Sequence, residues 1–199
     1  MKLALAICVW AAAVSVESYR LLSYDNAPGA LTSPPSTLAD PAFEQHGTNL
    51  NTLLVFLHPQ CSCSRATLGE LARLMATHPA NTRAYAIFFA PSNEPQDWIR
   101  SSLWGYASSI PNVQVRADED GRLAQAFHVQ TSGEVLLYDA GGNIAFSGGI
   151  TASRGHMGDN AGLFALDQLL SGQPTESRQT LPFGCHLSSD RSKNQGDLA

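Results

Sequence analysis

Charged side chains are scarce in this 199-residue chain. Lys and Arg number 12 and Asp and Glu 17, together 15% of the residues, against about 25% in typical soluble proteins. No stripe of basic residues stands out and the net charge is -5, so nucleic-acid binding is not predicted. No run of about 20 apolar residues is present, which excludes a membrane protein of several spans. The apolar share of 44% excludes a chain that is disordered throughout.

Cysteines are also few: Cys8, Cys61, Cys63 and Cys185. They do not suffice for a disulfide scaffold in a chain of this length, so the fold must depend on a hydrophobic core. Cys8 lies inside an apolar N-terminal run and is expected to have no role. Cys61 and Cys63 are separated by a single residue, and this spacing makes them the first candidates for chemistry.

Residues 1–23 have the composition of an export segment. Lys2 precedes an apolar run over residues 3–16, and residues 11–13 are alanines that offer a cleavage site. The run is shorter than the 20 or so residues that cross a bilayer, although a helix continuing to Leu22 would form an uncleaved anchor. We expect a signal peptide or an N-terminal membrane anchor, and the other interpretation is a buried helix.

Strands and helices alternate through the middle of the chain, which is typical of an α/β sheet, and a closing hairpin would make the sheet mixed. The sequence therefore predicts a linker over residues 24–45, one α/β domain over 46–172, and a polar tail over 173–199 with a Phe-Gly-Cys segment. Strands are expected at 52–57, 83–90 and 113–115, a hairpin at 134–138 and 143–147, and helices at 64–75, 97–108, 123–127 and 161–170.

The Cys61-Ser62-Cys63 motif falls between the first core strand and the first core helix. A helix N-terminus carries about half a positive charge, which stabilises a thiolate and makes it nucleophilic at neutral pH. A second thiol within reach can resolve a mixed disulfide. One intervening residue gives a tighter ring than the usual two, so we expect an oxidant or isomerase rather than a strong reductant. The opposing interpretation is that both cysteines are small buried residues.

A metal site is an alternative use of the same residues. Cys-x-Cys with a nearby histidine can bind Cu(I), a soft ion that thiolates suit. The set would be Cys61, Cys63 and His156, with His58 and Cys185-His186 as further candidates.

The order of elements and the cysteine position resemble the thioredoxin-like superfamily over residues 46–172. The stretch 113–149 looks like the second half of the TlpA and ResA type of thiol-disulfide oxidoreductases, with Asp-Gly, a short helix and a Gly-rich hairpin. Closer still is a RedB-like pattern. It comprises Thr131-Ser132-Gly133, Gly148-Gly149-Ile150, residues 154–160 (Arg-Gly-His-Met-Gly-Asp-Asn) and Phe183-Gly184-Cys185.

This resemblance implies a three-layer α/β/α fold with a central mixed sheet, and a substrate-binding role for Thr131, Ser132 and Gly133. Two departures matter. The family places a proline near Ser132 or Gly133 that holds substrate backbone and discourages metal binding, and this chain has none there. The Cys-x-Cys spacing, with no tryptophan before it, also differs from the family pattern.

Two late segments have more than one interpretation. The polar, Gly-rich stretch 154–160 is either a surface loop that caps the last helix or a loop beside the dithiol, with His156 as proton shuttle or ligand and Arg154 as an electrostatic stabiliser. Cys185 is either an idle tail cysteine, a second resolving cysteine or a third metal ligand. His128 is expected to be structural.

The sequence thus predicts an exported thiol-disulfide oxidoreductase with catalytic Cys61, Cys63 and Cys185, acting on protein thiols and disulfides without an organic cofactor. The bacterial periplasm or the outer face of the inner membrane is the expected location, and an upstream membrane reductant is a candidate partner. The alternative is a copper-binding assembly factor. A peroxide-reducing enzyme ranks last, because no Pro-x-x-x-Thr-x-x-Cys arrangement is present.

Overall fold

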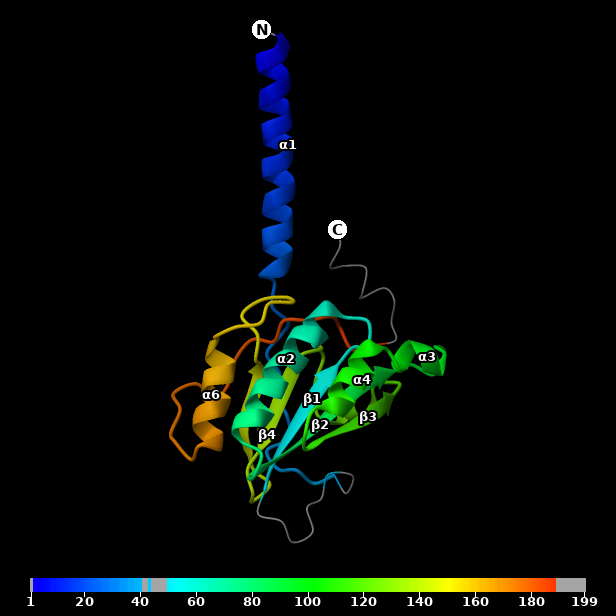
Figure 1. The fold of residues 1–199 in the computed structure, drawn as a ribbon, viewed down its shortest axis with the longest axis vertical. Helices are drawn as coiled ribbons and strands as arrows, with labels where there is room; N and C mark the ends of the chain where they lie inside the picture. Colours follow the sequence, from blue (N-terminus) through cyan, green and yellow to red (C-terminus); the bar gives the residue numbers. More distant parts are fainter. Residues whose placement is uncertain (1, 41–42, 44–49, 189–199) are drawn as a thin grey trace.

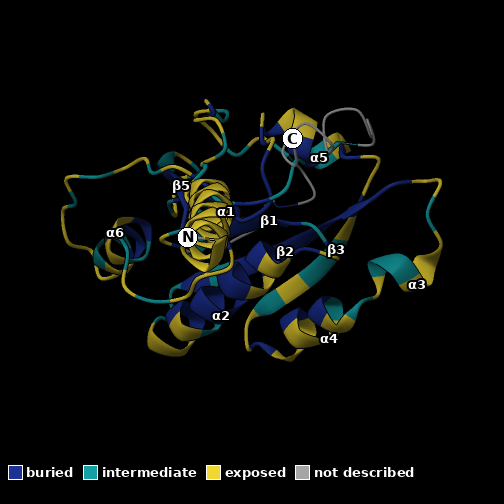
Figure 2. Cartoon of the chain, turned by 90° about the horizontal axis from the view of Figure 1, so that it is seen from above, coloured by how far each residue is buried: buried dark blue, intermediate teal, exposed yellow. Residues whose placement is uncertain are grey.

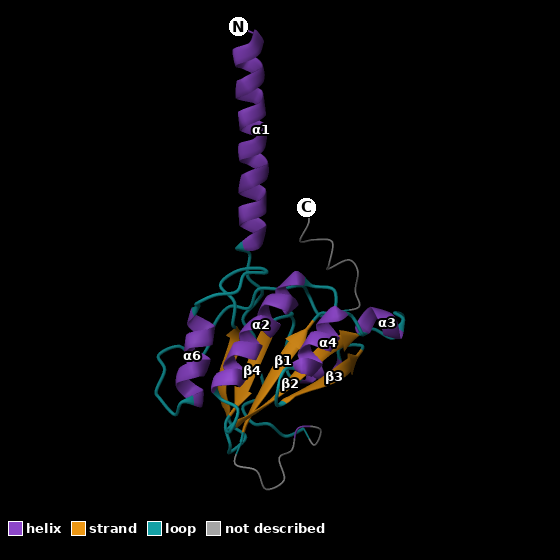
Figure 3. Cartoon of the chain, in the orientation of Figure 1, coloured by secondary structure: helices purple, strands orange, loops and turns teal. Residues whose placement is uncertain are grey.

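The computed structural model describes residues 2–40, 43 and 50–188. Its helices are α1 (Lys2–Asp25), α2 (Ser62–Thr77), α3 (Gln96–Ile99), α4 (Ser102–Ser109), α5 (Arg122–Ala126) and α6 (Ala161–Leu170). Its strands are β1 (Asn51–Leu57), β2 (Thr82–Ala90), β3 (Val113–Glu119), β4 (Glu134–Tyr138) and β5 (Ile144–Gly149). Figure 1 and Figure 3 show a sheet and its helices in one body, with α1 projecting from it.

The five strands form one sheet in the order β3-β2-β1-β4-β5. β1, β2 and β3 run parallel, whereas β4 is antiparallel to both β1 and β5. β1 and β2 are almost wholly buried along their length, as their continuous apolar runs predict for strands that are covered on both faces. Because β1 lies at the centre of the sheet, the turn that follows it lies at the carboxyl end of the parallel strands, in the middle of the sheet.

Helices cover both faces of the sheet, so the predicted three-layer α/β/α arrangement with a mixed central sheet is confirmed. One core cluster joins Leu53, Val55 and Leu57 of β1 to side chains of α2, α4 and α6. A second cluster on the other face joins Leu54 and Phe56 to side chains of α5. Figure 2 shows the buried faces of α2 and α4 turned toward the sheet, with α5 on the opposite side.

Two expected elements differ from the structure. The single helix expected over 97–108 is two helices, α3 and α4, because the chain is not helical at Arg100 and Ser101. The side chain of Ser101 accepts a hydrogen bond from the amide of Leu103 and so begins a new helix. The strand expected over 113–115 extends to Glu119, since the whole segment pairs with β2.

The segments on either side of the predicted domain contact its sheet. In the N-terminal segment, Thr37 forms an antiparallel bridge with Asn143, and Thr32 is buried. In the C-terminal segment, Gln179 forms a parallel bridge with Ser147 in β5. The amide of Gly29 also donates to the carbonyl of Pro182, so the two segments are joined to each other. The predicted tail residues 189–199 lie outside the described residues.

Helix α1 is long and apolar enough to cross a membrane by length and composition, and none of it is buried in the domain. Its apolar side chains, such as Leu5, Val9 and Trp10, are exposed all along the helix. A signal sequence near the N-terminus has the same properties. Figure 1 shows α1 leaving the domain on the side where α2 begins.

Candidate functional site

The first part of the site is the turn between β1 and α2. β1 ends at Leu57, and Cys61 is the N-cap residue of α2, with extended backbone angles of φ -106° and ψ 130°. The amide of His58 donates to the hydroxyl of Ser64 over 2.9 Å, which ties the turn to the first turn of the helix. Cys61 therefore lies at the positive end of the α2 dipole, and Cys63 lies in the first turn.

Cys185 is brought to this turn from the far end of the chain. Its Sγ lies 2.8 Å from Sγ of Cys61. Cys61 and Cys63 are buried, with 5% and 3% of their surfaces exposed, and Cys185 is partly exposed. All three are free thiols. The three cysteines that the sequence marked as candidates thus meet at one place, and the exposed Cys8 in α1 is apart from them.

The thiolate of this cluster belongs to Cys61. Hydrogen bonds from the thiols of Cys185 and Cys63 hold the pKa of Cys61 far below its ordinary value, and the amide of Ser64 and the hydroxyl of Ser132 act in the same direction against burial. The pKa of Cys63 is raised by its hydrogen bond to Cys61, by burial and by the negative charge on Cys61. The same causes raise the pKa of Cys185. One nucleophile is accordingly flanked by two protonated thiols.

Ser132 is one of the two residues, with Gly133, near which the resemblance leads us to expect a proline. It is fully buried, and its hydroxyl lies 3.7 Å from Sγ of Cys61, to which it donates. The amide of Cys185 donates to the same hydroxyl oxygen over 2.9 Å. This contact orients the hydroxyl hydrogen toward the Cys61 sulfur, so Ser132 stabilises the thiolate as well as the backbone around Cys185.

The Gly-rich stretch 154–160 lies beside the cysteines and also has a structural role. Nη1 of Arg154 donates to the carbonyl of Gly184 over 2.7 Å, and its Nε donates to the carbonyl of Ala27. The charge of Arg154 and a hydrogen bond from the backbone of Gly155 both act to lower the pKa of Cys63, against the larger causes that raise it. Asn160 accepts from the amide of Leu163 and so caps α6. The stretch therefore caps α6 and brings Arg154 near the thiols, and a role of His156 as proton shuttle stays a prediction.

The predicted metal set is not assembled. Within residues 2–40, 43 and 50–188, no group of three or more Cys, His, Asp or Glu side chains has an arrangement that could hold a metal ion. Nδ1 of His156 bonds the carbonyl of Arg154 over 2.7 Å. His58 packs against the rings of Phe89 and Trp98, and burial lowers its pKa. His128 bonds the carbonyl of Ser33 and is structural.

Glu70 and Glu134 are buried carboxyl groups that no sequence motif indicates. Glu70 in α2 is fully buried and accepts from the amide of Gly158 over 2.6 Å, which holds the 154–160 stretch against the helix. Glu134 in β4 is 1% exposed, and the Thr32 hydroxyl donates to its Oε1, while Oε2 has no partner. Burial raises the pKa of Glu134 to about 7. Neither glutamate has a recognisable motif, since both are defined by contacts between distant segments.

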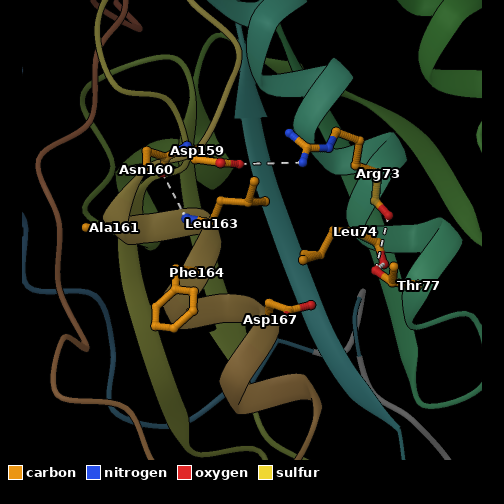
Figure 4. A pocket seen from close by; sticks show the side chains of 9 residues that line it. All are labelled: Arg73, Leu74, Thr77, Asp159, Asn160, Ala161, Leu163, Phe164 and Asp167. Atoms are coloured by element: carbon orange, nitrogen blue, oxygen red, sulfur yellow. Dashed lines mark hydrogen bonds and ion pairs between the residues drawn. The ribbon is translucent and has the colours of Figure 1, made fainter.

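A cavity of about 560 Å³ lies between α2 and α6, and no cysteine lines it. Figure 4 shows Leu163 and Phe164 of α6 on one side and Leu74 of α2 on the other, with the Arg73–Asp159 ion pair joining the two sides. It is thus separate from the thiol site.

The fold, with its dithiol after the central strand, is that of a thioredoxin-like α/β protein, as the resemblance implied. A solved thioredoxin-like protein in its oxidized form matches with a TM-score of 0.50 and 14% identity, covering 76% of this chain and 99% of the other. An uncharacterized conserved protein from Geobacillus kaustophilus matches with a TM-score of 0.57 and 20% identity, covering 82% and 92%. A hypothetical protein from Sinorhizobium meliloti matches with a TM-score of 0.55 and 17% identity, covering 82% of this chain and 96% of the other. No family model and no curated protein matches the chain. The RedB-like resemblance stays a prediction.

Proposed function

We propose that the protein is an exported thiol-disulfide oxidoreductase in which Cys61 is the nucleophile. The observation that carries the proposal is the stabilised thiolate at the N-terminus of α2, with a second thiol 2.8 Å from its sulfur. A buried thiolate whose pKa is lowered by specific hydrogen bonds is typical of exchange sites and is not needed for packing. The thioredoxin-like fold is consistent with this activity.

The exchange proceeds in two steps. The Cys61 thiolate attacks one sulfur of a partner disulfide, so that a Cys61–partner disulfide forms and the other partner sulfur leaves as a thiolate that takes up a proton. Cys63 or Cys185 then loses its proton and attacks Sγ of Cys61. This forms an internal disulfide and releases the second partner thiol. Two electrons pass from the protein to the partner, and the reverse sequence oxidises a partner dithiol.

Cys63 is the proposed resolving cysteine and Cys185 a second one. Both donate to Cys61 in the resting state, so each is placed to attack it. The raised pKa of each thiol delays its attack until Cys61 has lost its negative charge in the mixed disulfide, because that charge is among the causes of both shifts. Thr131, Ser132 and Gly133 are the proposed contacts for partner backbone, since the hydroxyl of Ser132, the middle residue of the three, donates to the Cys61 sulfur.

Export is proposed from α1, whose length and apolar surface suit a signal peptide or an anchor. With the helix retained, the domain is attached to a membrane, and its carbonyl at Asp25 accepts from the amide of Arg154 next to the thiol site. The periplasm or the outer face of the inner membrane is the proposed location, with protein thiols and a membrane reductant as partners.

Thiol trapping of the full-length protein in detergent tests this function. After equilibration with glutathione mixtures, free thiols are alkylated and mapped by mass spectrometry. We expect wild type and Cys8→Ser to exchange alike and Cys61→Ser to lose exchange at Cys63 and Cys185. Exchange in Cys61→Ser at the wild-type rate would refute Cys61 as the nucleophile. A potential near that of thioredoxin would refute the expected oxidising character.

A further inference from the structure

The C-terminal segment Gly184–Leu187 runs antiparallel to residues 130–132, immediately beside the Cys61 sulfur. The amide of Ser132 donates to the carbonyl of Cys185 over 2.8 Å, and the amide of Leu187 donates to the carbonyl of Gln130 over 2.8 Å. Thr131 and His186 form the bridge between these two bonds. The segment therefore pairs as one short strand with the backbone of residues 130–132, here called the partner-binding edge. An extended peptide adds to the exposed edge of a sheet in the same way.

Side chains fix the register of this added strand. Leu187 is 7% exposed and belongs to the second core cluster, which covers the α5 face of the sheet. Gly184 packs so closely on Ser132 that a Cβ atom at this position would overlap the Ser132 carbonyl. The guanidinium of Arg154 binds the Gly184 carbonyl. Together these contacts place Cys185, and no neighbouring residue, against Cys61.

The docked segment also closes the route to the nucleophile. Cys61 has 5% of its surface exposed and Cys63 has 3%, while the attacking sulfur of an exchange reaction must be reached by a partner disulfide. On the side of residues 130–132, the Cys61 sulfur is met by Cys185 and Ser132. A partner protein that uses this edge must therefore replace the segment.

We propose that segment Gly184–Leu187 is a built-in occupant of the partner-binding edge, which must leave before a protein disulfide reaches Cys61, so that Cys63 is the resolving cysteine while a partner occupies this edge. The inference rests on the proposed function and adds its regulation and its substrate class. The segment also indicates which partners fit. They present an extended stretch with a cysteine, a glycine just before it, and an apolar residue two positions after it, as Gly184, Cys185 and Leu187 do.

The test compares two full-length variants in the same tail. Leu187→Ser removes the buried apolar contact and keeps all three cysteines, whereas Leu181→Ser alters a side chain that is 43% exposed. The probe is a fluorescent peptide with the sequence of residues 180–188 in which serine replaces the cysteine, so binding needs no redox step. We expect Leu187→Ser to bind it roughly tenfold or more tightly than wild type and Leu181→Ser, because the competing segment is released.

Gly184→Val provides a second variant that leaves the core cluster intact, since its added side chain meets Ser132. It is expected to open the same edge and to increase the alkylation rate of Cys61 by a bulky maleimide by a similar factor. Equal peptide affinities in wild type, Leu187→Ser and Gly184→Val would overturn the inference, as would binding of a control peptide with valine in place of glycine. Glutathione exchange is measured on the same samples. If the samples exchange with glutathione but no variant binds the peptide, only the proposal that the segment occupies the edge is refuted. If the wild-type protein does not exchange with glutathione, the proposed function is refuted.

Discussion

Glu134 is expected to make the stability of the protein depend on pH. Its carboxyl group is 1% exposed and one of its oxygens has no partner. Burial raises its pKa to about 7, from an ordinary value of 4.5, against the opposing hydrogen bonds from Thr32 and from the backbone of Gln130. Between these values the folded protein holds a proton that the unfolded chain releases. Stability therefore falls as pH rises from about 4.5 to about 7, and it levels off above that range.

The size of this effect follows from the difference between the two pKa values. Each step of one in pKa corresponds to about 1.4 kcal/mol, so the full penalty at pH 8 is about 3 kcal/mol. Glu134→Gln keeps an oxygen for the Thr32 hydroxyl and removes the titrating group. We expect the free energy of unfolding of wild type to fall by about 3 kcal/mol relative to this variant between pH 4 and pH 8.

Urea unfolding of reduced, full-length protein in detergent measures the difference, with a series of pH values for each variant. Because the other titrating groups are common to both proteins, their contributions cancel in the comparison. Glu176→Gln is the matched control, since Glu176 is exposed and its replacement is expected to leave the pH dependence of stability unchanged. Parallel curves for wild type and Glu134→Gln over the whole range would refute the reasoning.

Three further predictions concern the thiolate, a helix cap and the core. Alkylation of Cys61 by iodoacetamide, mapped by mass spectrometry, is expected to change little between pH 6 and 8, whereas an ordinary thiol accelerates roughly 75-fold; an ordinary profile would contradict the lowered pKa. Asn160→Ala removes the cap of α6 and is expected to cost about 1 kcal/mol in urea unfolding, and an unchanged midpoint would count against the cap. Leu68→Ala, at a fully buried position, is expected to lower the free energy of unfolding by about 2–5 kcal/mol. Leu181→Ala is expected to lower it by less than about 0.5 kcal/mol. Equal losses in the two variants would argue against the described core.

The central elements follow from local sequence patterns. The apolar runs of β1 and β2 are continuous because both strands are buried on both faces, and such runs are visible in the sequence. Asn160 before an apolar run predicted the start of α6, and its side chain does cap that helix. The position of Cys61 at the start of α2 was predictable for the same reason, since it follows a strand and precedes a helical pattern.

The remaining features depend on contacts between segments far apart in the chain. Cys61 and Cys185 are separated by 124 positions, and no periodicity in either segment indicates that they meet. Burial raises the pKa of Glu134, and its hydrogen-bond partner Thr32 lies 102 positions away in the predicted linker. Ser101 is an ordinary serine in a helical pattern, so the division into α3 and α4 needed the side-chain geometry to be seen. Local patterns identify elements, and long-range packing decides which side chains share a site.

The wide separation of Cys61 and Cys185 has a thermodynamic consequence. A disulfide between them closes a loop of more than 120 residues that contains β2, β3, β4 and β5, whereas one between Cys61 and Cys63 closes a loop of three. By the loss of loop entropy in the unfolded chain, the long closure stabilises the fold by roughly 5 kcal/mol, and the short one by far less. The choice of resolving cysteine thus determines how strongly oxidation stabilises the fold, and the melting temperature of the oxidised protein reports which bond has formed.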